Sequence, residues 1–237
     1  MQNRIYSLDN AKASKSVALG YLNAIHYMAP SDFAGVGNLC PDASPGCRDA
    51  CLGLYSGHAG MVKHDTDINA VRASRIAKAQ RFMFERDAYM IDVVVATSRV
   101  VAKAQRENLI PVLRFNGSTD IPVERIKVLG NPSIIEMYSH VQWVDYTKNW
   151  RRFQRPLPSN YHLTFSLSEN NHHHALRLLS QGHNVAAVFR SLPTSWHGYP
   201  VINGDLHDLR HLDPKGVVVG LTPKGRKAKA DTSGFVL

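Results

Sequence analysis

Cysteine is scarce in this chain, and the few cysteines lie together. The 237 residues contain three of them, Cys40, Cys47 and Cys51, spaced as C-x6-C-x3-C. An odd number of cysteines so close together argues against a disulfide framework in a chain of this length. Cysteines that merely filled a core would be scattered. The scarcity therefore points to one segment as the place where chemistry is concentrated.

Long apolar runs are also missing. The most apolar later stretch, residues 89–96, is interrupted by Asp92 and is too short to cross a bilayer. The first ten residues contain no continuous apolar core, so they do not read as a signal peptide. Unpaired thiols are typical of a reducing compartment. We therefore expect a cytoplasmic protein with no membrane partner.

Three common catalytic patterns are absent: a P-loop, a dinucleotide-binding glycine motif and a nucleophile motif. Acidic residues are in the minority, with 19 against 28 basic ones, which gives a net charge of +9. This charge permits binding to nucleic acid or anionic cofactors, but by itself it supplies steering rather than function. The length suits one domain, and we found no repeat or linker, so we expect a single domain over residues 1–237.

The cysteine cluster loop, residues 35–60, is suited to wrapping around a compact object. Its prolines and glycine between Cys40 and Cys47 disfavour a regular helix or strand. Thiolates gathered on such a loop usually bind a metal. A 4Fe-4S cluster is normally held by four cysteines, so three would leave one iron open. That iron would take a side chain, water, substrate or a cofactor.

Two other interpretations of the cysteines stay open. Zinc is commonly held by three cysteines and one histidine, and His58 or His64 could supply the histidine. A zinc-stabilised protein with this charge would suit nucleic-acid binding. The third interpretation is that the thiols bind no metal. A cluster, if present, could also be non-catalytic and serve electron transfer, sensing or stability.

The rest of the chain alternates between strand and helix patterns. Apolar runs predict about six strands, at residues 17–25, 110–115, 142–146, 161–166, 185–189 and 217–221. Helical patterns predict helices capped by Asp65 or Asp67, over 87–105, after Pro132, over 150–154 and up to Gln181, before a basic tail at 224–229. This alternation predicts an α/β fold with a mainly parallel sheet. The sheet could be open or a curved partial (β/α)6 barrel.

Ligands of such sheets bind beyond the carboxyl ends of the strands. The cysteine loop follows the first predicted strand, and polar residues follow the next three. The candidate cofactor-binding residues at these ends are Asn116, Ser118, Asp120, Lys148 and Ser166.

Other polar groups have simpler explanations. His172, His173 and His174 point in different directions on a helix, so we expect a solvated helix start rather than a metal site. Asp205, His207 and Asp208 are expected to serve a turn. Arg114, in a predicted buried strand, should pair with a carboxylate. For Arg151, Arg152 and Arg155 beside Trp150, we prefer a solvated basic face to a nucleic-acid contact.

A three-cysteine loop after the first strand of a six-stranded β/α chain resembles the radical S-adenosylmethionine (SAM) enzymes. The resemblance implies a partial barrel, a 4Fe-4S cluster on Cys40, Cys47 and Cys51, and SAM on the open iron. It also implies a substrate and an electron donor. The candidates at the strand ends would orient the amino-acid and ribose parts of SAM. The superfamily commonly has C-x3-C-x2-C with an aromatic residue before the last cysteine, whereas this chain has Ala50 there.

A second resemblance is to a family of phage proteins called gene product 88. The residues that carry it are 38–52, 145–148, 204–210 and 220–226. This resemblance implies a viral protein made in the cytoplasm of a bacterial host, and it implies no activity.

Overall fold

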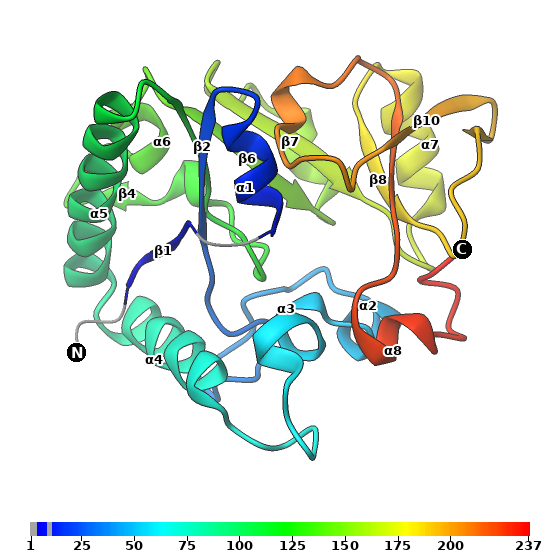
Figure 1. The fold of residues 1–237 in the computed structure, drawn as a ribbon, viewed down its shortest axis with the longest axis horizontal. Helices are drawn as coiled ribbons and strands as arrows, with labels where there is room; N and C mark the ends of the chain where they lie inside the picture. Colours follow the sequence, from blue (N-terminus) through cyan, green and yellow to red (C-terminus); the bar gives the residue numbers. More distant parts are fainter. Residues whose placement is uncertain (1–3, 9–10) are drawn as a thin grey trace.

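A nine-stranded sheet organises the computed structural model, which describes residues 4–8 and 11–237 (Figure 1). In spatial order the strands are β1 (Tyr6–Ser7), β2 (Tyr21–His26), β3 (Ile110–Arg114), β6 (Gln142–Thr147), β7 (Tyr161–Ser166), β8 (Val185–Val188), β11 (Val218–Leu221), β10 (Tyr199–Asn203) and β9 (Ser195–Trp196). The two edge strands β1 and β9 are antiparallel to their neighbours, and all other pairs are parallel. The fold is therefore α/β with a mostly parallel sheet, as predicted.

Each of the six predicted strand segments contains a strand, and these strands are neighbours in sequence order, β2-β3-β6-β7-β8-β11. The sheet nevertheless has nine strands rather than six. The added β1 and β9 have two residues each, too few for a periodic pattern. The added β10 contains Pro200, and none of its five residues is buried. It lacks the continuous apolar character from which the other strands were predicted.

The first predicted strand begins too early. Residue 17 ends a helix, α1 (Ala11–Val17), and β2 begins only at Tyr21. Gly20 lies between them with φ of 83°, a left-handed conformation that glycine adopts without strain. Val17 and Leu19 are about half exposed, at 47% and 52%. Their apolar character therefore extended the predicted strand without reflecting burial.

Helices occupy most of the connections between parallel strands. The α-helices after α1 are α2 (Pro45–Asp49), α3 (Leu52–Tyr55), α4 (Ala70–Phe84), α5 (Arg86–Arg106), α6 (Ile134–Met137), α7 (His172–Ser180) and α8 (Gly225–Lys229). The 3-10 helices are η1 (Gly57–Gly60), η2 (Val123–Arg125), η3 (Trp150–Gln154) and η4 (Arg210–Leu212). A separate two-stranded sheet is formed by β4 (Lys127–Val128) and β5 (Asn131–Ser133).

Two helix starts differ from those predicted. Helix α4 is capped by Asn69, whose side chain accepts a hydrogen bond from the N–H of Arg72 at 3.0 Å, rather than by Asp65 or Asp67. Helix α6 begins after Ser133, which forms a reciprocal capping box with Glu136. In the described ranges, no helix is both long and apolar enough to cross a membrane.

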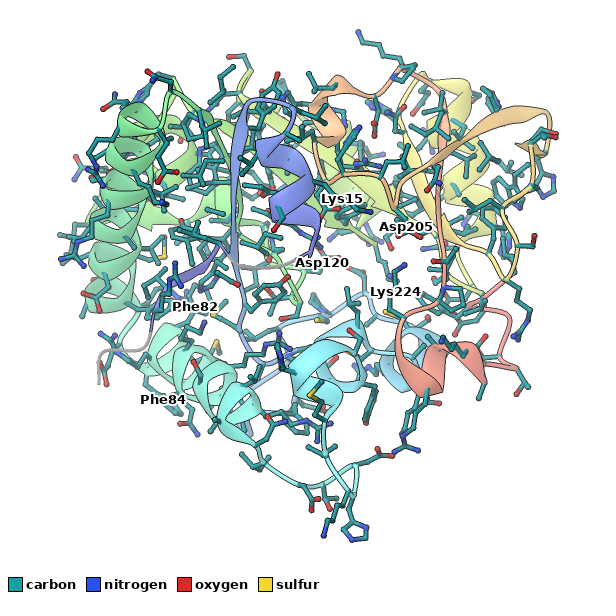
Figure 2. The ribbon with its side chains drawn as sticks, viewed as in Figure 1. Lys15, Phe82, Phe84, Asp120, Asp205 and Lys224 are labelled. Atoms are coloured by element: carbon teal, nitrogen blue, oxygen red, sulfur yellow. The ribbon has the colours of Figure 1, made fainter. Side chains whose placement is uncertain are left out.

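The main core lies between one face of the sheet and helices α4 and α5. Leu113 and Trp143 from the strands pack there in one buried cluster with Phe82 and Tyr89. Figure 2 contrasts Phe82, which is 2% exposed, with Phe84, which is 76% exposed at the end of the same helix. Because side chains alternate along a strand, the opposite face of the sheet carries a different set. That second face, with residues such as Tyr146, is the one that leads to the site.

Candidate functional site

A cavity of about 1120 Å³ lies at the carboxyl ends of the parallel strands. Its walls include residues that end or follow six of these strands, namely Tyr27, Asn116, Lys148, Ser166, Arg190 and Thr222. In Figure 1 the short helices α2, α3 and α8 gather along this lower edge of the sheet. The mouth of the sheet is therefore covered by the cysteine segment on one side and the C-terminal helix on the other.

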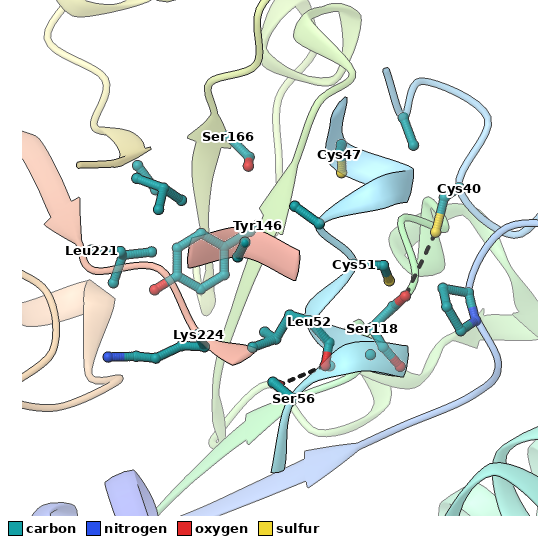
Figure 3. A pocket seen from close by; sticks show the side chains of 18 of the residues that line it. Cys40, Cys47, Cys51, Leu52, Ser56, Ser118, Tyr146, Ser166, Leu221 and Lys224 are labelled. Carbon is teal, nitrogen blue, oxygen red and sulfur yellow. Dashed lines mark hydrogen bonds between the residues drawn. The ribbon is translucent and has the colours of Figure 1, made fainter. Parts of the chain in front are cut away.

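The three cysteines and the five strand-end candidates all line this one cavity. Cys40, Cys47 and Cys51 are among its lining residues, and so are the five candidates from the strand ends, Asn116, Ser118, Asp120, Lys148 and Ser166. In Figure 3 the three cysteines occupy one side of the pocket and face Tyr146 and Ser166. The structure thus brings together the predicted donor set and the predicted strand ends. Their roles in binding a metal or cofactor stay predictions.

Short helices position two of the three thiols. Ser44 caps α2 and accepts a hydrogen bond from the N–H of Cys47 at 3.2 Å, while Cys51 is itself the cap residue of α3. The carboxylate of Glu169, in the loop after β7, accepts hydrogen bonds from Ser44 Oγ at 2.7 Å and from the N–H of Gly46 at 2.8 Å. One carboxylate from a distant part of the chain therefore fixes the start of α2.

Gly46 is required by crowding at this point. A Cβ atom at position 46 would collide with the side chains of Ser233 and Phe235, which cross over α2 near the C-terminus. The chain close to its C-terminus also joins the sheet, because the N–H of Leu237 donates to the carbonyl of Val188 at 2.9 Å. The cysteine helix is thus held between Glu169 and the C-terminal segment.

Burial controls the charge of the thiols. It raises the pKa of the Cys40 thiol to about 11, although the N–H of Ser31, 3.3 Å from Sγ, opposes the shift. Burial and the neighbouring Cys47 and Cys40 raise the pKa of Cys51 to about 12, against the N–H groups of Gly53 and Leu54. These thiols stay protonated at neutral pH unless a cation compensates their negative charge.

A positive charge is already present beside Cys47. The ammonium of Lys148 donates a hydrogen bond to Ser166 Oγ at 2.9 Å. Burial lowers the pKa of Lys148, but Cys47 and Asp120 together raise it more, so that its pKa lies above the usual value. Lys148 is therefore charged, and it is placed to stabilise an anionic sulfur at position 47.

A family model described as gene product 88 matches residues 4–237. The chain belongs to this family. No curated protein and no solved structure matches this chain. The match spans the four segments on which the resemblance to this family rested. All four of these segments supply residues that line the cavity.

In this member of the gene product 88 family, three of the five strand-end candidates have structural partners. Asn116 donates to the Ile121 carbonyl at 2.9 Å and to Asp145 Oδ2 at 3.0 Å. The hydroxyl of Ser118 donates to the Met28 carbonyl at 2.6 Å. Their side chains therefore shape the turn after β3.

Asp120, the third of these candidates, is engaged on both oxygens. It accepts from the N–H of Lys148 at 2.7 Å and from Arg152 Nη1 at 3.1 Å. Of the five candidates, Lys148 and Ser166 are left. Their side chains hydrogen-bond to each other, so they can reorient toward a bound molecule.

The cavity also contains polar groups that the sequence did not single out for it. The hydroxyl of Tyr146 is buried and has no hydrogen-bond partner among the described residues. The guanidinium of Arg114 lies 4.6 Å from the centre of the Tyr146 ring, and Arg114 Nε is 3.9 Å from Asp145 Oδ1. The expected carboxylate partner of Arg114 is thus found. An orphaned buried hydroxyl is typical of a site that receives water or a ligand.

Arg152 is not part of a solvated basic face, contrary to the prediction. Its guanidinium is 2% exposed and bonds to Glu124 Oε2 at 2.7 Å, to Asp120 Oδ1 at 3.1 Å and to the Tyr161 hydroxyl at 2.8 Å. Arg151 and Arg155 are exposed, as predicted. Because a 3-10 helix has about three residues per turn, the consecutive residues Arg151 and Arg152 point in different directions from η3, which composition alone does not reveal.

None of the histidines in the described part of the chain lines the cavity. His58 and His64, the proposed zinc ligands, are exposed. Over residues 4–8 and 11–237, no three or more His, Cys, Asp or Glu side chains are arranged as ligands of one metal ion. The histidine run begins α7, as expected. Asp205 lies in the turn after β10, as expected. Its carboxylate accepts a hydrogen bond from Thr222 Oγ1 at 2.6 Å and pairs with Lys224 at 3.1 Å (Figure 2).

The thiol pKa values lead to a test on metal-free protein. Alkylation of Cys40 and Cys51 by iodoacetamide should be slow at pH 8 and accelerate about tenfold per pH unit, since only the thiolate reacts. Because folding raises these pKa values from 9.0, the folded state holds the protons more tightly, and its stability should fall as pH rises above about 9. Peptide mass spectrometry of native and denatured samples provides the measurement. Equal rates in the two samples would contradict the burial argument.

Proposed function

We propose that this protein binds a 4Fe-4S cluster through Cys40, Cys47 and Cys51, with the fourth iron turned toward the cavity. The observation that carries the proposal is the position of the thiols. They come from one loop and line one wall of a cavity whose other walls are strand ends with polar and cationic groups. Three thiolates with one open position suit a cluster that takes a further ligand.

The residues around the thiols suit such a group. Backbone N–H groups approach the sulfurs of Cys40 and Cys51, and Lys148 lies beside Cys47. Hydrogen bonds to sulfur and nearby charge are the means by which proteins adjust cluster potentials. The raised pKa values of Cys40 and Cys51 also indicate that a cation is needed before these thiols ionise. These contacts support the proposal that the three thiols hold an iron–sulfur cluster.

The strand order supports the finer proposal of a partial (β/α)6 barrel. Six parallel strands follow one another in sequence order, β2-β3-β6-β7-β8-β11, as in a singly wound barrel. In a doubly wound sheet the order would reverse at a switch point. The face opposite the main core would then be the inside of the barrel, with Arg114, Tyr146 and Ser166 directed into it.

With SAM on its open iron, a bound cluster would supply the electron that cleaves SAM reductively, as in the radical SAM enzymes. The chain itself would bind and orient the molecules. Lys148 and Ser166 can hold a carboxylate, and the unpartnered hydroxyl of Tyr146 can donate a hydrogen bond to a ligand. The cysteine segment and α8 cover the mouth and limit the access of water. Free thiols and a reducible cluster both suit the reducing cytoplasm.

Metal analysis tests the cluster directly. Protein purified without oxygen should be brown and contain about four irons and four sulfides per chain. Stoichiometric zinc in protein expressed with ample iron would overturn the proposal and favour the zinc interpretation.

The SAM step needs a separate measurement. Addition of SAM to the dithionite-reduced protein should change its EPR spectrum, because SAM would replace a weak ligand on the open iron. The reduced protein should also form 5′-deoxyadenosine. If SAM does not change the EPR spectrum and no 5′-deoxyadenosine forms, SAM chemistry is rejected. The remaining interpretation is then a non-catalytic cluster for electron transfer, sensing or stability.

A further inference from the structure

A row of aromatic rings lies on the surface formed by three separate segments, η3, the start of α7 and the β9 turn. Its members, called the ring row below, are Trp150, His172, His173, His174, Trp196 and His197. His173 and His197 are exposed, and the others are partly exposed. The proposed cluster site uses none of them, so they require another explanation.

The rings of the row form two groups, and neighbouring rings within each group are in contact. Trp150 stacks on His174 with ring centres 4.5 Å apart and planes 18° apart, and His174 is 3.8 Å from His173. On the far side, His172 is 5.9 Å from Trp196, which is 4.4 Å from His197. Two groups of three rings, which meet at the start of α7, therefore present several π surfaces.

Arginines flank one end of this row. The guanidinium of Arg151 lies 5.1 Å from the centre of the Trp150 ring, and that of Arg177 lies 5.8 Å from it. Both arginines are exposed, and neither has a carboxylate at ion-pair distance in the part of the chain that the structure describes. Exposed guanidinium groups without a carboxylate partner remain available for an external anion.

The electrostatic surroundings of the row are basic. Burial lowers the pKa of His174, and the charged groups that lower it further are His173, Arg151 and Arg177. Neither η3 nor α7 contains an acidic residue. The chain as a whole carries a net charge of +9. An anionic partner therefore fits this surface better than a neutral or cationic one.

We propose that the ring row binds single-stranded nucleic acid, with bases stacked on the rings and phosphates held by Arg151 and Arg177. Stacked rings beside unpaired arginines are what an unpaired strand requires, because its bases expose their faces. In a duplex these faces are already stacked on one another. An acidic peptide would use the arginines but would gain little from a row of rings. This inference goes beyond the cluster proposal and does not depend on it.

The ring row adjoins the cavity along the chain. Trp150 follows the cavity residue Lys148 by two positions, and His172 follows the cavity residue Ser166 by six. A strand bound on the row would thus begin beside the carboxyl ends of β6 and β7. The same strand could extend to the cavity mouth.

Binding is measured by fluorescence anisotropy of labelled dT20 and U20, which separates DNA from RNA. We expect the double variant Arg151→Glu/Arg177→Glu to weaken binding at least about tenfold, because two phosphate contacts become repulsive. The slope of log K against log salt should become shallower by about 1.4, since each single-strand phosphate contact contributes about 0.7. The matched control is Arg99→Glu/Arg106→Glu on the exposed side of α5, which changes the net charge equally and should have little effect.

Stacking is tested separately with Trp150→Leu. Leucine keeps an apolar side chain against the cluster around Phe165, on which Trp150 packs, but it removes the π face. We expect an affinity loss of about 5- to 150-fold, the range of one lost base stack. The proposal would be overturned if the two double-charge variants lost affinity equally or if Trp150→Leu had no effect. It would also be overturned if the protein bound duplex more tightly than single strands, bound polyglutamate as tightly as dT20, or bound no single strand at all.

Discussion

Replacement of any one of Cys40, Cys47 and Cys51 by alanine is expected to abolish cluster binding. The chain contains only these three cysteines, so no other cysteine can replace one of the proposed ligands. Loss of a partner outside the ligand shell already costs about 10- to 100-fold in metal affinity, so loss of a ligand should cost more. Iron and sulfide content after anaerobic purification, with the visible absorption of the cluster, provides the measurement.

The matched control for these variants is Asp49→Ala. Asp49 is exposed in the same short helix as Cys47, so its replacement tests whether any change in the segment disrupts the site. Full iron content is expected in this control. The cysteine variants should also unfold at lower denaturant concentration, because cluster binding contributes to folding free energy. A cysteine variant with the full complement of iron would exclude that cysteine as a ligand.

Replacement of Arg152 by methionine is expected to cost about 3–5 kcal/mol of folding stability, the usual effect of breaking a buried ion pair. Arg152 pairs with Asp120 and Glu124 while it is 2% exposed. Methionine keeps much of the side-chain volume but removes the buried cation that hydrogen-bonds to both carboxylates. Urea unfolding of wild type and variant provides the free energies.

Two further variants separate charge from volume. Replacement of the exposed Arg155, three residues away, by methionine should lower the free energy of unfolding by less than about 0.5 kcal/mol. Adding Glu124→Gln to Arg152→Met should recover part of the loss, because one orphaned charge is then removed. If the stability loss of the double variant equals the sum of the losses of Arg152→Met and Glu124→Gln, the loss in Arg152→Met does not come from unpaired charge.

Much of the parallel sheet could be predicted because its strands are local signals. Residues 142–146 and 161–166 are apolar runs of strand length that end in polar residues, and both form strands at those positions. Helix α5 was predicted within one residue at each end, since no glycine or proline interrupts its pattern. Helix α7 was predicted to end at Gln181 and ends at Ser180, and Gly182 follows it with a φ of 82°, the left-handed conformation in which glycine commonly ends a helix.

The errors came from features without a local signal. The edge strands β1 and β9 exist only because a neighbouring strand offers hydrogen bonds. Arg152 has an ordinary basic sequence context, and only the packing of η3 against η2 places it beside buried carboxylates. The ring row joins residues 150, 172–174 and 196–197, which no pattern in the chain connects.

The sequence by itself determined the candidate donor set, since three cysteines in one loop limit the possible chemistry wherever that loop lies. It also determined that polar residues follow the apolar strands. Only the tertiary structure decided that these residues share one cavity, because parallel strands bring their carboxyl ends to the same edge. The Ser44 hydroxyl and Glu169, 125 residues apart, meet 2.7 Å from each other, and Lys148 lies beside Cys47. Contacts at such separation depend on strand order and register, which no local pattern of residues encodes.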